Sequence, residues 1–163
     1  MKEAELLAEM LDHTRQLTRF YLKHTADIDL QKRFEIGDFQ TNSVHWIVAH
    51  LSWAEWALTL KALGSDVSPA PWFTLFKIGA PAPDPGQFPP YEEVRRVFDE
   101  THATALAHIR SLEDATLKEE NELGMSFGGG KEKRMIIQHC IRHEGTHTGH
   151  LGWILRMSGK KVI

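Results

Sequence analysis

The sequence contains a single cysteine, Cys140, among its 163 residues. One cysteine excludes a disulfide within the chain and a zinc site built from several thiolates. Such sparse cysteine usage is typical of proteins in a reducing compartment, so we expect a cytoplasmic protein. We also expect Cys140 to be a small buried hydrophobic residue rather than a nucleophile.

Long apolar runs are also missing. No apolar stretch approaches the roughly 18 residues that a membrane-spanning helix needs. The first residues, MKEAELLAEMLDHTRQL, are acidic and amphipathic, whereas a secretory signal is basic and then apolar. We therefore expect neither a targeting segment nor a membrane partner.

Neither sign of charge dominates the composition. The chain has 19 basic and 22 acidic residues, a formal net charge of -3 and a pI near 6.4. Because no region of the sequence concentrates the positive charge that would attract a polyanion, we do not expect nucleic acid as a partner. A chain of 163 residues with 42% hydrophobic content is long enough to form one domain with a hydrophobic core, but it is short for two domains. We therefore predict a single domain over residues 1–163.

Proline is absent outside one segment. All seven prolines lie within residues 64–90, GSDVSPAPWFTLFKIGAPAPDPGQFPP, so no long helix is expected there. Fully extended, this segment could reach well beyond the length of a helix of roughly 30 Å. We therefore expect it to cross from one end of a helical bundle to the other. Its aromatic residues, Trp72, Phe73 and Phe76, predict a lid or rim that packs down on the bundle.

Apolar residues spaced three and four apart predict four amphipathic helices, over residues 3–24, 42–64, 91–114 and 131–157. Asn42 or Ser43 can cap the second helix, and Gly64 and Gly159 can end the second and fourth. In the first helix the pattern is carried by Leu6, Leu7, Met10, Leu11, Leu17, Phe20 and Tyr21. No repeat or strand-rich region is evident. The predicted fold class is all-α, a four-helix bundle with a long proline-rich crossover between helices two and three.

The predicted fourth helix carries four histidines in the stretch IIQHCIRHEGTHTGHLGWILR: His139, His143, His147 and His150. Their spacings of four, four and three place them on one helix face. Such a stripe can bind a metal through an i, i+4 pair, can form a polar outer face, or can consist of core histidines that hydrogen-bond their neighbours. A further histidine, His50, lies on a tryptophan-rich face of the second helix. Three imidazoles with one open position suit zinc, nickel or ferrous iron.

Three segments also resemble a known family over nearly the whole chain: NSVHWIVAHLSWAEWAL, YEEVRRVFDETHATALAHIRSLEDATL and HCIRHEGTHTGHLGWILR. They look like the DinB/YfiT-like family of four-helix-bundle metalloproteins, whose pattern is one histidine in helix two and H-x-x-x-H in helix four. The resemblance implies an up-down-down-up bundle with His50, His143 and His147 as metal ligands. We expect His139 to support this site, and His150 either to support it or to face solvent.

The family resemblance also implies a function. Members include bacillithiol S-transferases and mycothiol-dependent maleylpyruvate isomerase, so it implies a metal-dependent transferase that uses a low-molecular-weight thiol. The crossover would then line the site of the electrophile, and the family tends to form homodimers. Two alternatives are a non-catalytic, stress-related metal-binding module and a metal-dependent hydrolase. The sequence identifies no catalytic residue, and it leaves the metal, the thiol and the electrophile open.

Several other residues receive structural predictions. Glu144 lies about 100° around the helix from His143, so we expect it at the surface or in an interface. Glu55 is expected to form an ion pair, and Asp12 to lie on a solvated face. The tryptophans are expected in the core or in an interface, namely Trp46, Trp53, Trp56 and Trp153.

Overall fold

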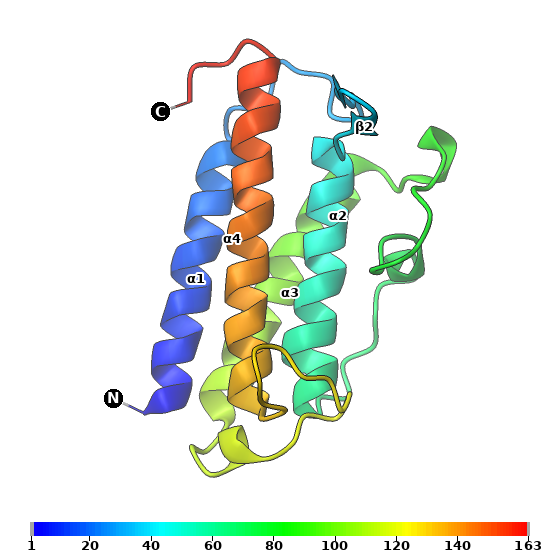
Figure 1. The fold of residues 1–163 in the computed structure, drawn as a ribbon. Helices are drawn as coiled ribbons and strands as arrows, with labels where there is room; N and C mark the ends of the chain where they lie inside the picture. The colour runs from blue at the N-terminus through cyan, green and yellow to red at the C-terminus, as the bar shows by residue number, and fades with distance from the viewer. Residues whose placement is uncertain (1, 163) are drawn as a thin grey trace.

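The computed structural model describes residues 2–162, which form four long helices (Figure 1): α1 (Glu3–Leu22), α2 (Val44–Glu55), α3 (Tyr91–Ser111) and α4 (Lys133–Met157). A π-helical turn (Trp56–Leu60) and a 3-10 turn (Lys61–Leu63) extend α2. Further 3-10 turns are Phe73–Leu75, Pro85–Gln87 and Thr116–Lys118, and a small hairpin, β1 (Glu35–Ile36) with β2 (Phe39–Gln40), precedes α2. The all-α prediction is confirmed. None of the helices in the described range is long and apolar enough to cross a membrane.

The helices run up, down, down and up, as predicted. In Figure 1, α1 and α4 point in one direction and lie side by side, while α2 and α3 point in the other. Helix α1 also packs against α3, and α2 packs against both α3 and α4. Two parallel helices in succession need a connection as long as a helix. Residues 64–90 provide it, since they return along the outside of the bundle from the end of α2 to the start of α3 (Figure 1).

Local signals set the helix ends. The hydroxyl of Ser43 accepts a hydrogen bond of 3.2 Å from the backbone N–H of Trp46, which caps the start of α2. Gly64, at φ +90°, ends the helical segment that begins with α2, and Gly159, at φ +80°, follows the end of α4. These predictions are confirmed. Helices α1 and α3 end a few residues earlier than predicted, because the polar residues at their ends add nothing to an apolar stripe.

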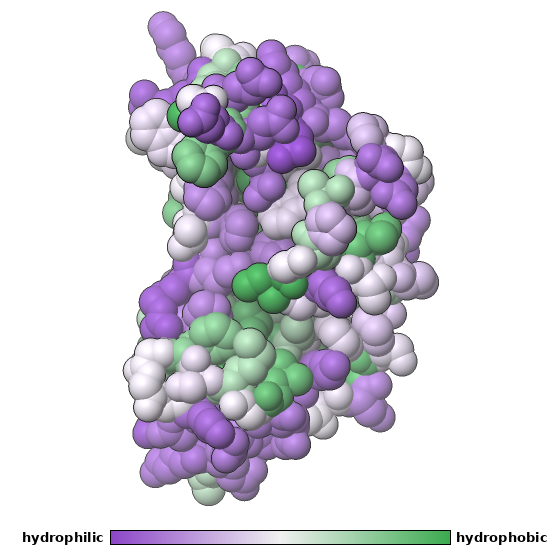
Figure 2. Space-filling view, turned by 45° about the vertical axis from the view of Figure 1, so that its right-hand side comes forward, coloured by the Kyte–Doolittle hydropathy of each residue, from purple (hydrophilic) through white to green (hydrophobic). Residues whose placement is uncertain are grey.

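The crossover is part of the core rather than a loose loop. Trp72, Phe73 and Phe76 are buried against α2 and α3, in a cluster with Ile47 and Phe98. The predicted lid therefore packs directly over α2, the helix that carries His50. Figure 2 looks at the face that carries the crossover and shows apolar side chains in its middle, bordered by hydrophilic ones.

Helix α1 has apolar side chains on two faces. Leu7 and Leu11 point into the bundle, whereas Leu6, Met10, Leu17 and Phe20 are 40–47% exposed. The apolar residues that predicted this helix thus belong to two different stripes. The inner stripe continues with a charged residue, Arg15, which is 0% exposed.

Candidate metal centre

Three histidines from two helices meet inside the bundle. His50 lies on α2, and His143 and His147 lie one turn apart on α4. One nitrogen from each ring lies within 4.8 Å of the others, and the Nε2 atoms of His50 and His143 are 3.2 Å apart. The structure therefore brings together the three residues that the family resemblance implied. A group with this geometry can hold a metal ion.

A backbone carbonyl orients His50. Its Nδ1 atom lies 2.7 Å from the carbonyl oxygen of Phe76, and the indole of Trp46 stacks on the imidazole at 4.6 Å. Since Nδ1 donates to the carbonyl, Nε2 is left with a free electron pair that faces the other two histidines. The crossover thus fixes the orientation of one metal-binding side chain. This contact could not be predicted from the sequence, because a backbone acceptor can belong to any residue type.

The three imidazoles are neutral at pH 7. Burial lowers the pKa of His50, and burial followed by the charges of neighbouring histidines lowers the pKa of His143 to about 4 and of His147 to about 3. Neutral imidazole is the form that binds a metal. The Nδ1 atoms of His143 and His147 are buried and have no hydrogen-bond partner among the described residues. No protein group within residues 2–162 therefore holds a proton on Nδ1 of either ring, whereas Nε2 of His143 has Nε2 of His50 as a partner at 3.2 Å.

We expect the metal-free protein to become less stable as the pH falls from about 6.5 to about 5. Unfolded histidines take up protons below a pKa of about 6.5, whereas His143 and His147 stay neutral in the folded protein in this range. Because the unfolded state then binds more protons, the free energy of unfolding decreases. Urea denaturation at both pH values measures the decrease. It should be smaller in the double variant His143→Asn/His147→Asn, and an equal decrease there would assign the effect to other groups.

The two remaining histidines of the stripe lie next to this group. His139 stacks on Phe127 with a ring separation of 3.7 Å, and its ring is 5.9 Å from that of His143. His150 is exposed, and its ring meets that of His147 edge-on at 5.2 Å. His139 thus lies where a supporting residue was expected, and His150 lies at the solvent-facing end of the stripe.

A buried ionic network lies on other faces of the same helices. The guanidinium of Arg15 donates to Glu144 at 2.6 Å, to Glu55 at 2.8 Å and to the backbone carbonyl of Phe98 at 2.9 Å. The hydroxyl of Thr18 donates to Glu144 at 2.8 Å. Arg15 and both glutamates are at most 1% exposed. The network therefore joins all four helices through one fully buried cation.

His102 extends this network on α3. Its Nδ1 lies 2.7 Å from Glu55 and its Nε2 lies 3.1 Å from Asp12. Both ring nitrogens of His102 therefore face carboxylate oxygens. Burial alone would raise the pKa of Glu55, but Arg15 and His102 hold it below its usual value. The buried guanidinium of Arg15 thus faces the carboxylates of both Glu55 and Glu144.

Some predictions for this region were wrong. Glu144 is buried, not at the surface, because α1 packs on that side of α4 and supplies Arg15. Asp12 is partly buried against His102 rather than on a fully solvated face. The ion pair expected for Glu55 is confirmed. Arg15 and His102 were missed, although there was a signal: Arg15 follows Leu11 by four residues and so occupies a position of the inner stripe.

Cys140 is buried beside this network, as predicted. Burial, and then the negative charges of Glu55 and Glu144, raise the pKa of its thiol well above the usual value. The side chain therefore stays a neutral thiol, which is a poor nucleophile.

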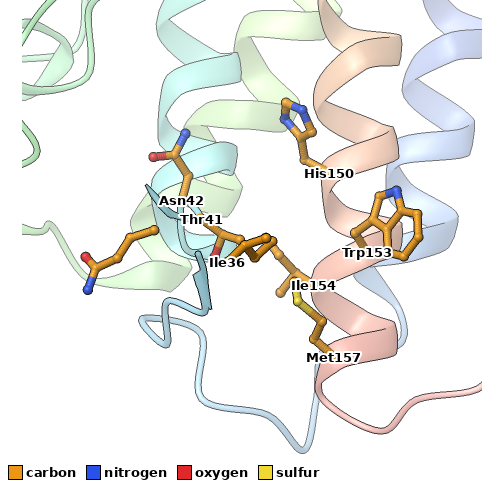
Figure 3. A pocket seen from close by; sticks show the side chains of 8 residues that line it. Ile36, Thr41, Asn42, His150, Trp153, Ile154 and Met157 are labelled. Carbon is orange, nitrogen blue, oxygen red and sulfur yellow. The ribbon is translucent and has the colours of Figure 1, made fainter. Parts of the chain in front are cut away.

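Two cavities lie near the three histidines. The larger, of about 550 Å³, lies between the linker that precedes α2 and the C-terminal part of α4, and His150 and Trp153 line it (Figure 3). The smaller, of about 80 Å³, is lined by Trp46 together with Arg33 and Pro83. Of these two cavities, the crossover, expected to line the site of an electrophile, contributes to the smaller one. Trp153 is 68% exposed, so it is not a core residue.

Comparison with known families agrees with this arrangement. Residues 10–151 match the family model of the DinB superfamily. The matched range contains α2, α3 and all three histidines of the candidate metal centre. No curated protein matches the chain.

Proposed function

The chain belongs to the DinB superfamily, and we propose that it binds one divalent metal ion through His50, His143 and His147. The observation that carries this proposal is the convergence of three neutral imidazoles from two helices, one of them oriented by the Phe76 carbonyl. Three protein ligands leave a coordination position open, which is typical of catalytic rather than structural zinc sites. Nickel and ferrous iron suit the same ligands.

We further propose that the protein is a metal-dependent transferase that uses a low-molecular-weight thiol of the bacillithiol or mycothiol type. A divalent ion in this position would supply the positive charge that lowers the pKa of a thiol. The chain itself supplies orientation and shielding: the Phe76 carbonyl fixes His50, and Trp46 and Trp53 cover its ring. The cavity beside His150 has room for a second substrate.

Hydrolysis is the weaker alternative. A metal-dependent hydrolase needs a general base near the open coordination position. Among the described residues no carboxylate belongs to the three-histidine group, and none lines the larger cavity. The glutamates nearest to the three histidines in the sequence are Glu55 and Glu144, and both form an ion pair with Arg15. A non-catalytic metal-binding module remains the other alternative, and the cavity beside the histidines favours an enzyme over it.

The first test is the metal content of untagged protein purified without chelators. We expect close to one equivalent of zinc, nickel or iron per chain by elemental analysis. The metal-loaded protein should then join bacillithiol or mycothiol to a neutral electrophile, as detected by mass spectrometry of the conjugate. A chelator should abolish this activity and added metal should restore it.

The outcomes separate the alternatives. One equivalent of metal without conjugation of either thiol would support the non-catalytic module and overturn the transferase. No bound metal, even after incubation with zinc, nickel or ferrous iron, would overturn the metal site itself.

A homodimer is a separate proposal. The outer stripe of α1 exposes Leu6, Met10, Leu17 and Phe20, which are 40–47% accessible in the single chain. Apolar residues on one outward helix face are suited to contact with the same face of a second copy.

A further inference from the structure

The larger cavity differs from the rest of the surface in its chemistry. Its walls are apolar and come from Ile36 in the linker before α2 and from Trp153, Ile154 and Met157 on α4. Its polar groups are uncharged amide and hydroxyl groups and the imidazole of His150. None of its lining residues carries a carboxylate, an ammonium or a guanidinium group. An ionic ligand would therefore find no carboxylate, ammonium or guanidinium partner among the residues that line this cavity.

One end of the cavity adjoins the candidate metal centre. Figure 3 shows His150 and Asn42 at the same end, with Trp153, Ile154 and Met157 further along α4. The ring of His150 is also in edge-on contact with that of His147, at 5.2 Å. The polar end of the cavity is thus the end nearest the three histidines.

Two large apolar side chains of this cavity are more than half exposed. Trp153 is 68% exposed and Ile36 is 56% exposed, and they lie on two different chain segments. Exposed apolar groups that face a common hollow often mark a ligand site. A volume of about 550 Å³ lies within the range of small-molecule sites.

We propose that this cavity binds the electrophile, a small neutral molecule with an aromatic or aliphatic body. The body would lie against Trp153 and Ile36, and the polar, reactive group would lie between Asn42 and His150, beside the metal centre. This inference rests on the transferase function proposed above. In the metal-free protein a charged group would lack an ionic side-chain partner here, whereas the smaller cavity, which Asn42 also lines, contains Arg33.

The test compares two probes with the same ring system, 1-naphthalenemethanol and 1-naphthalenesulfonate, by isothermal titration calorimetry. We expect the neutral alcohol to bind metal-free protein at least about tenfold more tightly than the anion, a difference of about 1.4 kcal/mol. Ile36→Asp should weaken binding of the alcohol at least about tenfold, because it places a carboxylate in the apolar wall. The matched control is Ile78→Asp, at a position on the crossover that is 76% exposed and does not line the cavity. It should leave the affinity unchanged.

Several outcomes would overturn the inference. They are no binding of the alcohol at millimolar concentration, equal affinity for both probes, and equal effects of the two substitutions. If sedimentation velocity showed that the probe dissociates a dimer, the natural occupant of the cavity would be a second copy of the chain. Zinc titration of the same samples separates this proposal from the metal site. Zinc binding without probe binding contradicts only the cavity, and probe binding without zinc binding contradicts the metal function.

Discussion

Replacing Arg15 by leucine should lower the free energy of unfolding by about 3–5 kcal/mol, a typical cost of leaving a buried charge without its partner. Arg15 is fully buried and contacts Glu55, Glu144 and the carbonyl of Phe98. Without it the carboxylates of Glu55 and Glu144 would stay in the interior without the guanidinium that they share. The leucine would also lose the contact of the guanidinium with the ring of Phe98, now 3.6 Å from its centre.

Urea denaturation measures this loss, and Arg19→Leu is the matched control. Arg19 lies one turn further along α1 and pairs with Asp99 at 2.7 Å, but these side chains are 35% and 44% exposed. An ion pair accessible to solvent contributes about 1 kcal/mol or less. If Arg15→Leu cost no more than Arg19→Leu, the network would not stabilise the bundle as described.

A combined variant tests whether the buried charges act together. In a background of Glu55→Gln and Glu144→Gln, loss of Arg15 no longer strands two carboxylates. The cost of Arg15→Leu should therefore be smaller there than in wild type, since contacting residues are not additive. An unchanged cost would show that Arg15 acts through packing alone.

Replacing His147 by alanine should weaken metal binding by more than about 100-fold. Loss of a group that merely orients a ligand typically costs 10–100-fold in affinity, and loss of a ligand should cost more. His50→Ala and His143→Ala should have effects of the same size, because all three nitrogens belong to one group. Competition with a chromophoric chelator measures the affinity, and circular dichroism checks that each variant is folded.

Two control histidines distinguish ligation from a general effect. His13 is exposed on α1 outside the three-histidine group, so His13→Ala should leave the affinity unchanged. His139 stacks on Phe127 next to His143, so His139→Ala should change it only a few-fold. If His139→Ala abolished binding and His147→Ala did not, the ligand pair on α4 would be His139 and His143.

The ionic network and the candidate metal centre use different faces of the same two helices. Glu55 and Glu144 hold α2 and α4 to the shared Arg15, while His50 and the histidines of α4 converge elsewhere between them. The network thus fixes the relative position of the helices on which the convergence depends. A rigid supporting arrangement of this kind is what a preorganised metal site requires.

The sequence by itself determined the four helices, the crossover and the histidine positions. Apolar spacing, the Ser43 cap and Gly64 act within a few residues, so they can be read locally. The crossover followed from the confinement of proline to residues 64–90. Helical geometry placed His143 and His147 on one face. The spacing alone was also compatible with a solvated stripe or with core histidines. Only the family resemblance selected His50 as their partner.

The tertiary structure alone decided which face of α1 is buried, which carbonyl orients His50 and where a cavity forms. Helix α1 has apolar residues on two faces, so its pattern could not show that Leu11 and Arg15 point inward together. A buried arginine is tolerable only where other helices supply anions, and these lie 40 and 129 residues away in the chain. Every residue has a backbone carbonyl, so the residue type of Phe76 does not indicate that its carbonyl orients His50. These features depend on contacts between distant segments, which no local pattern contains.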